Sequence, residues 1–180
     1  MDLYYVSYGR GASFLLNVPP NRKGVVDDAD AQSLREFGEW KRATFAKNLA
    51  VNAKLTPSNV RGNSKTFGAH NLLDGDRDTY WATDDAVKTP ELTLDFETPV
   101  TFNIIRLQEN IKLGQRIGAV AIDQWKDGAW SKIAGATSIG NCRLIRLDDY
   151  QTMNKLRLRI TESPVCPALS DFGLFAEPRR

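Results

Sequence analysis

Residues 71–83, NLLDGDRDTYWAT, predict a tight acidic loop between two apolar segments. Asp74, Gly75 and Asp76 are typical of a turn that needs positive φ and hydrogen bonds from side chains to the backbone. The same oxygen atoms suit a hard cation such as Ca²⁺, which takes about six to eight oxygen ligands. Tyr80 and Trp81 then offer a large apolar area where the chain returns to a core.

Strand patterns surround this loop from residue 49 to residue 180. Apolar and polar residues alternate in ELTLDF at 91–96, CRLIRL at 142–147 and KLRLRI at 155–160. Further strands are expected at 50–55, 101–107, 117–125, 129–133 and 169–177. Asp127-Gly128 is a strong hairpin signal between two of them. Many short strands with turns between them predict a mainly β fold, an antiparallel β-sandwich or jelly roll.

The first 48 residues have a different character. Residues 12–18, ASFLLNV, form a continuous apolar run that ends at two prolines. Such a run predicts a strand that is buried on both faces, as in a parallel sheet. Three aspartates at 27, 28 and 30 then open an amphipathic helix of roughly residues 29–47. One strand and one helix cannot bury their own faces, so this unit needs the rest of a sheet or another surface.

Composition excludes several classes of function. The formal net charge of +2 is too small to indicate a nucleic-acid partner, and no apolar run is long enough to insert into a membrane. Cys142 and Cys166 have no metal-ligand spacing, and we interpret them as buried, inert thiols rather than a disulfide. A single histidine excludes a multi-histidine zinc cluster, and no Ser or Cys has a convincing base for a catalytic triad.

Several separated motifs resemble known families. The stretch 71–83, the strand at 91–96 and the segment FGLF at 172–175 resemble the discoidin domain, the coagulation factor 5/8 type C module of the galactose-binding-like fold. A closer resemblance is to the C-terminal part of the α-L-fucosidases of glycoside hydrolase family 29. It is carried by SNVRG at 58–62, FGAHN at 67–71, LGQR at 113–116 and TSIGN at 137–141.

The resemblance extends to the N-terminal residues. ASFLLNVPP at 12–20 and LREFGEW at 34–40 resemble the last strand and the last helix of that family's (β/α)₈ barrel. The resemblance therefore implies that residues 1–48 are a strand-helix remnant of the barrel and that residues 49–180 are a discoidin-like β-sandwich domain. It also implies a secreted or periplasmic parent protein, although the first residues show no signal peptide.

The function implied by this resemblance is that of a C-terminal fragment of a retaining α-L-fucosidase, which releases L-fucose from glycans. Retaining hydrolysis needs two carboxyl groups about 5 Å apart. The family carries both on earlier barrel strands, so no residue here inherits a catalytic role, and we expect the fragment alone to be inactive. As an accessory domain it would bind a fucosylated glycan or a galactose-type sugar. The alternative is a purely structural domain that packs on the catalytic barrel or at an oligomer interface; adhesion to protein or lipid is a third.

The resemblance also implies a structural Ca²⁺. Its ligands would be Asp74, Asp76, Thr79 and Glu177. The alternative is a metal-free turn in which the loop carboxylates accept hydrogen bonds from backbone N–H groups. The neighbouring Asp84 and Asp85 are interpreted as solvated loop residues.

A sugar site needs an aromatic platform and polar groups at one end of the sandwich. The candidate sugar-binding residues are Trp130, His70, Arg61 and Asn63. Trp81 and Trp125 lie in strand patterns and are expected in the core. For His70, a purely structural role is the alternative. Arg116 is expected to form an ion pair with an acidic residue such as Glu109.

Overall fold

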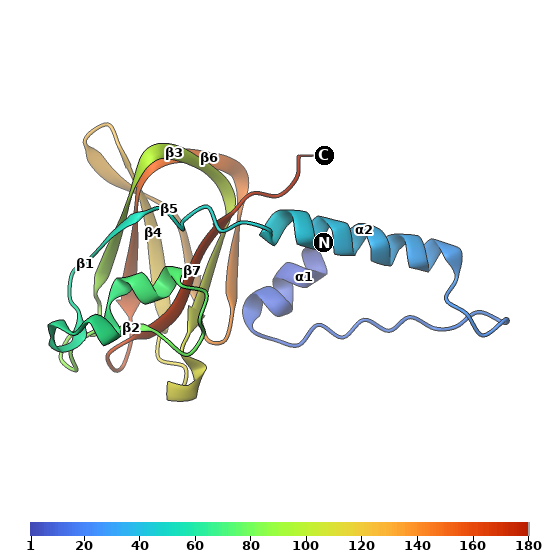
Figure 1. The fold of residues 1–180 in the computed structure, drawn as a ribbon, viewed down its shortest axis with the longest axis horizontal. Coiled ribbons are helices and arrows are strands. Elements are labelled where there is room, and N and C mark those ends of the chain that lie inside the picture. Colours follow the sequence, from blue (N-terminus) through green and yellow to red (C-terminus); the bar gives the residue numbers. More distant parts are fainter. Residues whose placement is uncertain (180) are drawn as a thin grey trace.

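The computed structural model describes residues 1–179, which form a β-sandwich with a helical extension on one side (Figure 1). The helices are α1 (Asp2–Val6) and α2 (Asp28–Phe45). The strands are β1 (Lys54–Pro57), β2 (Trp81–Ala82), β3 (Glu91–Glu109), β4 (Ala119–Lys126), β5 (Ala129–Thr137), β6 (Arg143–Glu162) and β7 (Ala168–Phe175). Short 3₁₀ turns, η1 (Tyr8–Arg10), η2 (Arg61–Asn63), η3 (Lys65–Phe67), η4 (Ala69–Leu73) and η5 (Ile111–Leu113), lie in the connections. None of the described helices combines the length and the apolar character needed to cross a membrane.

Two long strands, β3 and β6, link the two layers of the sandwich. All pairings are antiparallel, and the strand order is β2-β7-β3-β6-β4-β5, with β1 paired to β3. Residues 92–95 of β3 pair with β1, whereas residues 104–109 pair with β7. Between them the register with β6 shifts from Asp95 to Val100, and such an irregularity bends a strand. The predicted antiparallel sandwich is confirmed.

The same bend corrects the predicted number of strands. The runs at 91–96 and 101–107 belong to one continuous strand, β3, and those at 142–147 and 155–160 belong to β6. In each case the intervening residues stay extended rather than forming a turn, although the β3–β6 pairing is interrupted between Asp95 and Val100 and between Phe102 and Ile104. Each long strand therefore contributes apolar side chains to both halves of the core.

The core lies between the layers. Its largest fully buried side chains include Trp81, Phe102, Phe172, Leu92 and Leu158. Trp81 is in the core as predicted, and its indole N–H donates to the carbonyl of Asn59 at 3.0 Å. Cys142 and Cys166 are free and buried, also as predicted, and burial raises the pKa of the Cys142 thiol.

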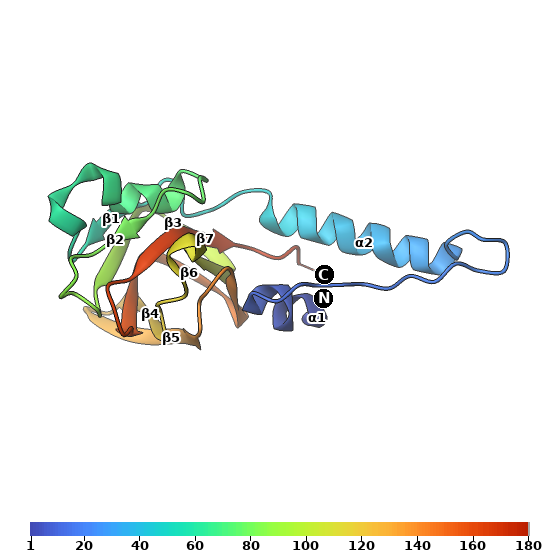
Figure 2. The same ribbon diagram turned by 90° about the horizontal axis from the view of Figure 1, so that it is seen from below.

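The N-terminal extension contains the predicted helix but not the predicted strand (Figure 2). Helix α2 begins where the Asp27 carboxylate accepts a hydrogen bond from the Ala29 N–H at 3.1 Å. Residues 12–18 are extended but pair with no strand, and Leu15 is 93% exposed. The reason is that an isolated strand has no neighbour for its backbone groups and no second layer for its faces. That these residues are a barrel remnant stays a prediction.

An aromatic cluster attaches the extension to the sandwich. Tyr4 packs edge-on against Phe37 and Trp40, each at 5.8 Å between ring centroids. Phe45 at the end of α2 lies 5.1 Å from Phe175 of β7. Just beyond the helix, the Asn48 side chain donates to one backbone group of β7 and accepts from another. The extension and the sandwich are therefore joined by a second apolar core.

Candidate carbohydrate-binding site

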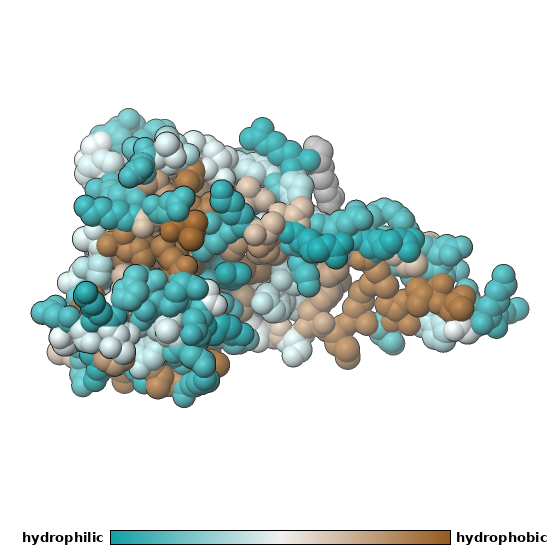
Figure 3. Space-filling model, in the orientation of Figure 1, coloured by the Kyte–Doolittle hydropathy of each residue, from teal (hydrophilic) through white to brown (hydrophobic). Residues whose placement is uncertain are grey.

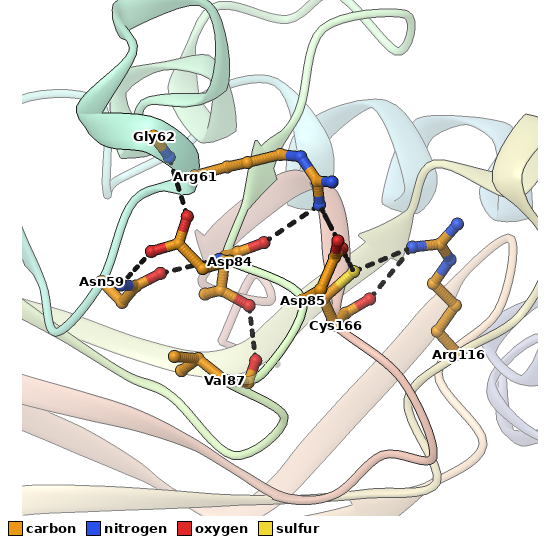
Figure 4. Close-up of polar contacts among 9 residues, drawn as sticks. Asn59, Arg61, Gly62, Asp84, Asp85, Val87, Arg116 and Cys166 are labelled. Carbon is orange, nitrogen blue, oxygen red and sulfur yellow. Dashed lines mark hydrogen bonds and ion pairs between the residues drawn. The ribbon is translucent and has the colours of Figure 1, made fainter.

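A pocket of about 300 Å³ opens where the loops next to β1, β2, β3 and β6 meet. Its lining consists of Arg61, Tyr80, Ala82, Asp85, Leu113, Arg116, Cys166 and Ala168. Ligand pockets in proteins span about 300–1,000 Å³, so this one is of a size for a small group such as a sugar residue. Figure 4 shows Arg61 and Arg116 on opposite sides of Cys166, with Asp85 beside it.

Arg61 and Asp85 form an ion pair at the rim of the pocket. The Arg61 NH1 lies 2.8 Å from the Asp85 Oδ1 and also donates to the carbonyl of Thr83 at 3.4 Å. The Asp85 side chain is 79% exposed, and the bond from Arg61 holds the pKa of its carboxyl below the usual range. A guanidinium beside a carboxylate offers donors and acceptors together, which is what two neighbouring sugar hydroxyls require.

Asp84 fixes the loop that carries Arg61. Its carboxylate accepts from the Asn59 side chain at 2.9 Å and from the Gly62 N–H at 2.8 Å. Its own N–H donates to the Asn59 side chain at 2.9 Å. The bond from Asn59 and then that from Gly62 lower the pKa of Asp84. The prediction of a solvated Asp84 is therefore wrong, because this half-buried carboxylate closes the loop at η2; Asp85 is exposed but paired.

Arg116 lies across the pocket from Arg61. Its NH1 donates to the Cys166 carbonyl at 3.1 Å and approaches the Cys166 sulfur at 3.4 Å, while its Nε donates to the Leu113 carbonyl at 3.3 Å. The Cys166 sulfur also lies 3.7 Å from the Arg61 guanidinium. The buried thiol therefore separates the two positively charged groups.

The predicted ion pair between Arg116 and Glu109 does not form between their side chains. Glu109, only 2% exposed, accepts hydrogen bonds from the backbone N–H of Arg116 at 2.6 Å, of Ile117 at 2.9 Å and of Gly140 at 2.6 Å. Three backbone donors already satisfy this carboxylate, so the guanidinium is free to turn to the pocket. Sequence reasoning missed Arg116 as a pocket residue, although the LGQR segment had drawn attention to it.

The four predicted sugar-binding residues do not come together. Arg61 lines the pocket, and Asn63 is exposed at the end of the same 3₁₀ turn. His70 lines a separate apolar groove beside Leu55 and Leu73. Trp130 lies on the β4–β5 hairpin. The candidate residues thus occupy three different places on the sandwich.

Trp130 packs against Trp125. The two residues are directly opposite in the antiparallel register, and their rings meet edge-on at 5.1 Å. Trp125 is 39% exposed, so the prediction that it lies in the core is wrong. The physical reason is that the two tryptophans lie on the outer face of the sheet, where they pack against each other and against Lys155 and Arg157 of β6.

The predicted calcium ligands do not form one site. The Asp74 carboxylate accepts from the Asp76 N–H at 2.8 Å and from the Thr79 hydroxyl at 2.6 Å, so the turn is closed by its own side chains. Glu177 follows the far end of β7, where it accepts from the side chains of Arg146 and Asn103. Across the described residues, no three His, Cys, Asp or Glu side chains are placed to hold a metal ion. Glu177 therefore does not join the other three predicted ligands, and binding of Ca²⁺ by the loop stays a prediction.

Comparison with known sequences points to one group of enzymes. The chain is 36% identical over 180 residues to α-L-fucosidase 1 of Arabidopsis thaliana and 35% identical over 179 residues to putative α-L-fucosidase 1 of Oryza sativa subsp. japonica. The matches cover 98% of this chain but only 36% and 34% of those proteins. The chain thus spans about a third of the length of these relatives.

Solved structures agree in fold. A Ruminococcus gnavus GH29 fucosidase in complex with fucose matches 99% of this chain and 36% of its own, with a TM-score of 0.91 at 33% identity. A putative α-L-fucosidase from Bacteroides thetaiotaomicron matches 98% and 39%, with a TM-score of 0.92 at 28% identity. A chitosan-binding module from Paenibacillus sp. IK-5, at 21% identity and a TM-score of 0.61, shows the fold alone.

The family assignment rests on the sandwich. Residues 54–170, more than half of the chain, match the F5/8 type C domain family. This range contains the acidic loop and every loop that lines the pocket. It also agrees with the resemblance to the C-terminal part of GH29 α-L-fucosidases that the sequence motifs show. The chain therefore belongs to the F5/8 type C domain family.

Proposed function

We propose that this chain is a non-catalytic, sugar-binding accessory domain of an α-L-fucosidase. The observation that carries the proposal is the Arg61–Asp85 pair at the rim of the loop-end pocket. The partner would be a fucosylated glycan or a galactose-type sugar. The parent enzyme would be a retaining hydrolase that acts outside the cytoplasm, and this domain would hold it near its substrate.

The pocket offers both kinds of contact that a sugar ring needs. The Arg61–Asp85 pair supplies donors and acceptors for two adjacent hydroxyl groups. Tyr80, held against Phe67 with 5.4 Å between ring centroids, supplies an apolar surface for the C–H face of the ring. Asp84 and Asn59 fix the loop in advance, which reduces the entropy lost on binding.

The chemistry of the pocket supports a binding role rather than hydrolysis. Retaining glycosidases place two carboxyl groups about 5 Å apart on either side of the scissile bond. Asp85 is the one carboxylate among the residues that line this pocket, and it is paired with Arg61. We therefore expect no cleavage of an aryl α-L-fucoside by the chain alone.

Calorimetric titration of the whole chain tests this proposal. L-fucose, galactose and a fucosylated oligosaccharide are the probes, and we expect saturable binding of at least one of them. Arg61→Ala should weaken that binding by about tenfold or more, since each hydrogen bond to a charged group contributes about 1.5–3 kcal/mol. Arg22→Ala, in the extension, is the matched control and should bind as the unchanged chain does. The absence of heat with every sugar, in a chain shown to be folded, would overturn the proposal.

A second candidate function rests on the apolar surface of the extension. Leu15, Leu16, Val25 and Val26 are exposed there, and Figure 3 shows an apolar stretch along this part of the molecule. Exposed apolar patches of this kind mark protein–protein contacts. The surface would pack on the catalytic barrel of the parent enzyme, which makes the domain a structural support as well.

Self-association of the isolated chain tests whether this apolar surface is a docking surface. In the isolated chain the apolar stretch is uncovered, so we expect sedimentation to show concentration-dependent association and a hydrophobic dye to bind. The double variant Leu15→Glu, Leu16→Glu should remove most of both effects without altering sugar binding. A chain that stays monomeric and binds no dye would contradict the packing role.

A further inference from the structure

Arg116 brings to the pocket a positive charge that the protein does not compensate. Its Nε and NH1 donate to the carbonyls of Leu113 and Cys166, which are neutral acceptors. Within residues 1–179, no carboxylate lies at ion-pair distance from its guanidinium, and its NH2 makes no hydrogen bond. The NH2 group of the guanidinium is therefore available to a ligand.

The position of Arg116 is set before any ligand arrives. The two carbonyl contacts hold the half-buried guanidinium, and the Glu109 carboxylate holds the Arg116 backbone N–H at 2.6 Å. A planar guanidinium that is already ordered loses little freedom on binding. Figure 4 shows it pointing toward the Cys166 side of the pocket, opposite Arg61.

The charges around the pocket do not cancel. Of the three charged residues in its lining, Arg61 and Asp85 neutralise each other at 2.8 Å, which leaves Arg116. The neighbouring Asp84 is not part of this lining, and its carboxylate is turned to the Asn59 amide and the Gly62 N–H. The lining therefore carries one net positive charge.

We propose that this pocket selects a sugar with an anionic substituent, a carboxylate or a sulfate, which Arg116 contacts while the Arg61–Asp85 pair contacts neighbouring hydroxyl groups. The positive charge and the unused NH2 suit either anion, because a charge-assisted hydrogen bond to a carboxylate or sulfate oxygen is stronger than a neutral one. This inference rests on the proposed function, because it assumes that the pocket binds sugar, and it adds the class of sugar. The buried thiol of Cys166 lies between the two guanidinium groups.

Calorimetry with D-galactose, D-galacturonic acid and galactose 6-sulfate tests the selection. We expect at least one acidic sugar to bind about tenfold or more tightly than galactose, since a bond between charged groups exceeds one between neutral groups by that order. The preference should weaken as the salt concentration rises. The acidic sugar whose affinity exceeds that of galactose by the larger factor, the uronic acid or the sulfate ester, identifies the anion that the pocket prefers.

Variants at Arg116 separate this inference from the proposed function. Arg116→Gln should abolish the preference for an acidic sugar over galactose, whereas Arg116→Lys, which keeps the charge, should retain part of that preference. Arg22→Gln is the matched control, and circular dichroism verifies the fold of each variant.

The other possible results distinguish failure of this inference from failure of the proposed function. If galactose and the acidic sugars bind equally, or if Arg116→Gln keeps the preference, the selection is overturned while the sugar site stands. If no sugar binds to a folded chain, the proposed function itself fails. If inorganic sulfate binds as tightly as galactose 6-sulfate, the site recognises an anion without sugar, and the inference also fails.

Discussion

Single buried carboxylates organise this domain at the residue scale. Glu109 uses both oxygens to hold three backbone N–H groups from two loops. Asp123 instead receives two arginines of β6, Arg157 at 2.8 Å and Arg159 at 2.6 Å. Both carboxylates are about 2% exposed, so water cannot take the place of a hydrogen-bond partner that they lose. Loss of the Glu109 charge leaves buried N–H groups without a partner, and loss of the Asp123 charge leaves two partly exposed guanidinium groups without their shared carboxylate; both losses are costly.

The first prediction concerns Glu109. Glu109→Gln should lower the free energy of unfolding by about 1–3 kcal/mol, because the amide cannot accept at both ends and leaves a buried N–H unpaired. Urea denaturation followed by fluorescence measures the change. Glu97→Gln, at an exposed position of β3, should stay within about 0.5 kcal/mol. Equal stabilities for the two variants would contradict the anchoring role.

The second prediction concerns pH and Asp123. The hydrogen bond from Arg159 is the largest cause that lowers the pKa of Asp123. A lowered pKa means that the ionised group stabilises the fold above its unfolded pKa of about 3.9, and that this contribution is lost as the pH falls through the folded value. Asp123→Asn should therefore lower stability by about 3 kcal/mol at neutral pH. The difference between the two proteins should shrink below about pH 4; a constant difference down to pH 2 would refute this.

At the scale of elements, the β4–β5 hairpin is an independent feature of the sandwich. Asp127 and Gly128 take φ of 52° and 78°, as a tight hairpin turn requires. On the two strands that flank the turn, Trp125 and Trp130 pack together. The Arg157 guanidinium lies 4.6 Å from the centroid of the Trp130 ring. One face of Trp130 is therefore already occupied by the protein. The two tryptophans therefore stabilise the hairpin and do not line the loop-end pocket.

This arrangement predicts a structural effect of Trp130. Trp130→Ala should lower the free energy of unfolding by about 1–2 kcal/mol, through lost ring packing and cross-strand contact. The near-ultraviolet circular dichroism of the tryptophan pair should also disappear. Sugar binding at the pocket should stay unchanged in Trp130→Ala. Arg61→Ala should show the opposite pattern, with weaker sugar binding and unchanged stability. A loss of sugar affinity with unchanged stability would instead place Trp130 in the binding site.

At the scale of the whole molecule, Glu177 fastens the extension to the sandwich. Its carboxylate accepts from the Tyr5 hydroxyl at 2.9 Å and from the Arg146 Nε at 2.9 Å, so the chain beyond β7 holds helix α1. Arg146 also lies 3.0 Å from Asp2. Together with the aromatic cluster, these bonds keep the two parts in one arrangement.

The last prediction follows from this link. Glu177→Ala should open the extension, because the Tyr5 hydroxyl and the Arg146 guanidinium lose a shared partner. Hydrogen exchange should become faster in residues 1–47, with little change in the strands of the sandwich. Glu36→Ala, on the exposed face of α2, is the control. Unchanged exchange in the extension would show that the aromatic cluster alone holds it.

The sequence by itself determined the local structure. Alternating apolar residues predicted the antiparallel sandwich, the aspartates at 27–30 predicted the start of α2, and Trp81 was correctly placed in the core. These features depend on periodicity and on capping, which act between near neighbours in the chain. The motifs also carried the family, which the match over residues 54–170 confirms.

Only the tertiary structure decided which distant residues meet. Arg61 and Arg116 come from loops on different strands and face one pocket, while Glu177 is kept from Asp74 by the length of β7. Two predicted strands form one continuous strand, β3, with a register shift between them. Trp125 faces Trp130 instead of the core. Such outcomes depend on strand register and on how loops pack, and neither is encoded in local periodicity. The pattern of apolar residues therefore specifies the sandwich, and its folding assembles the site.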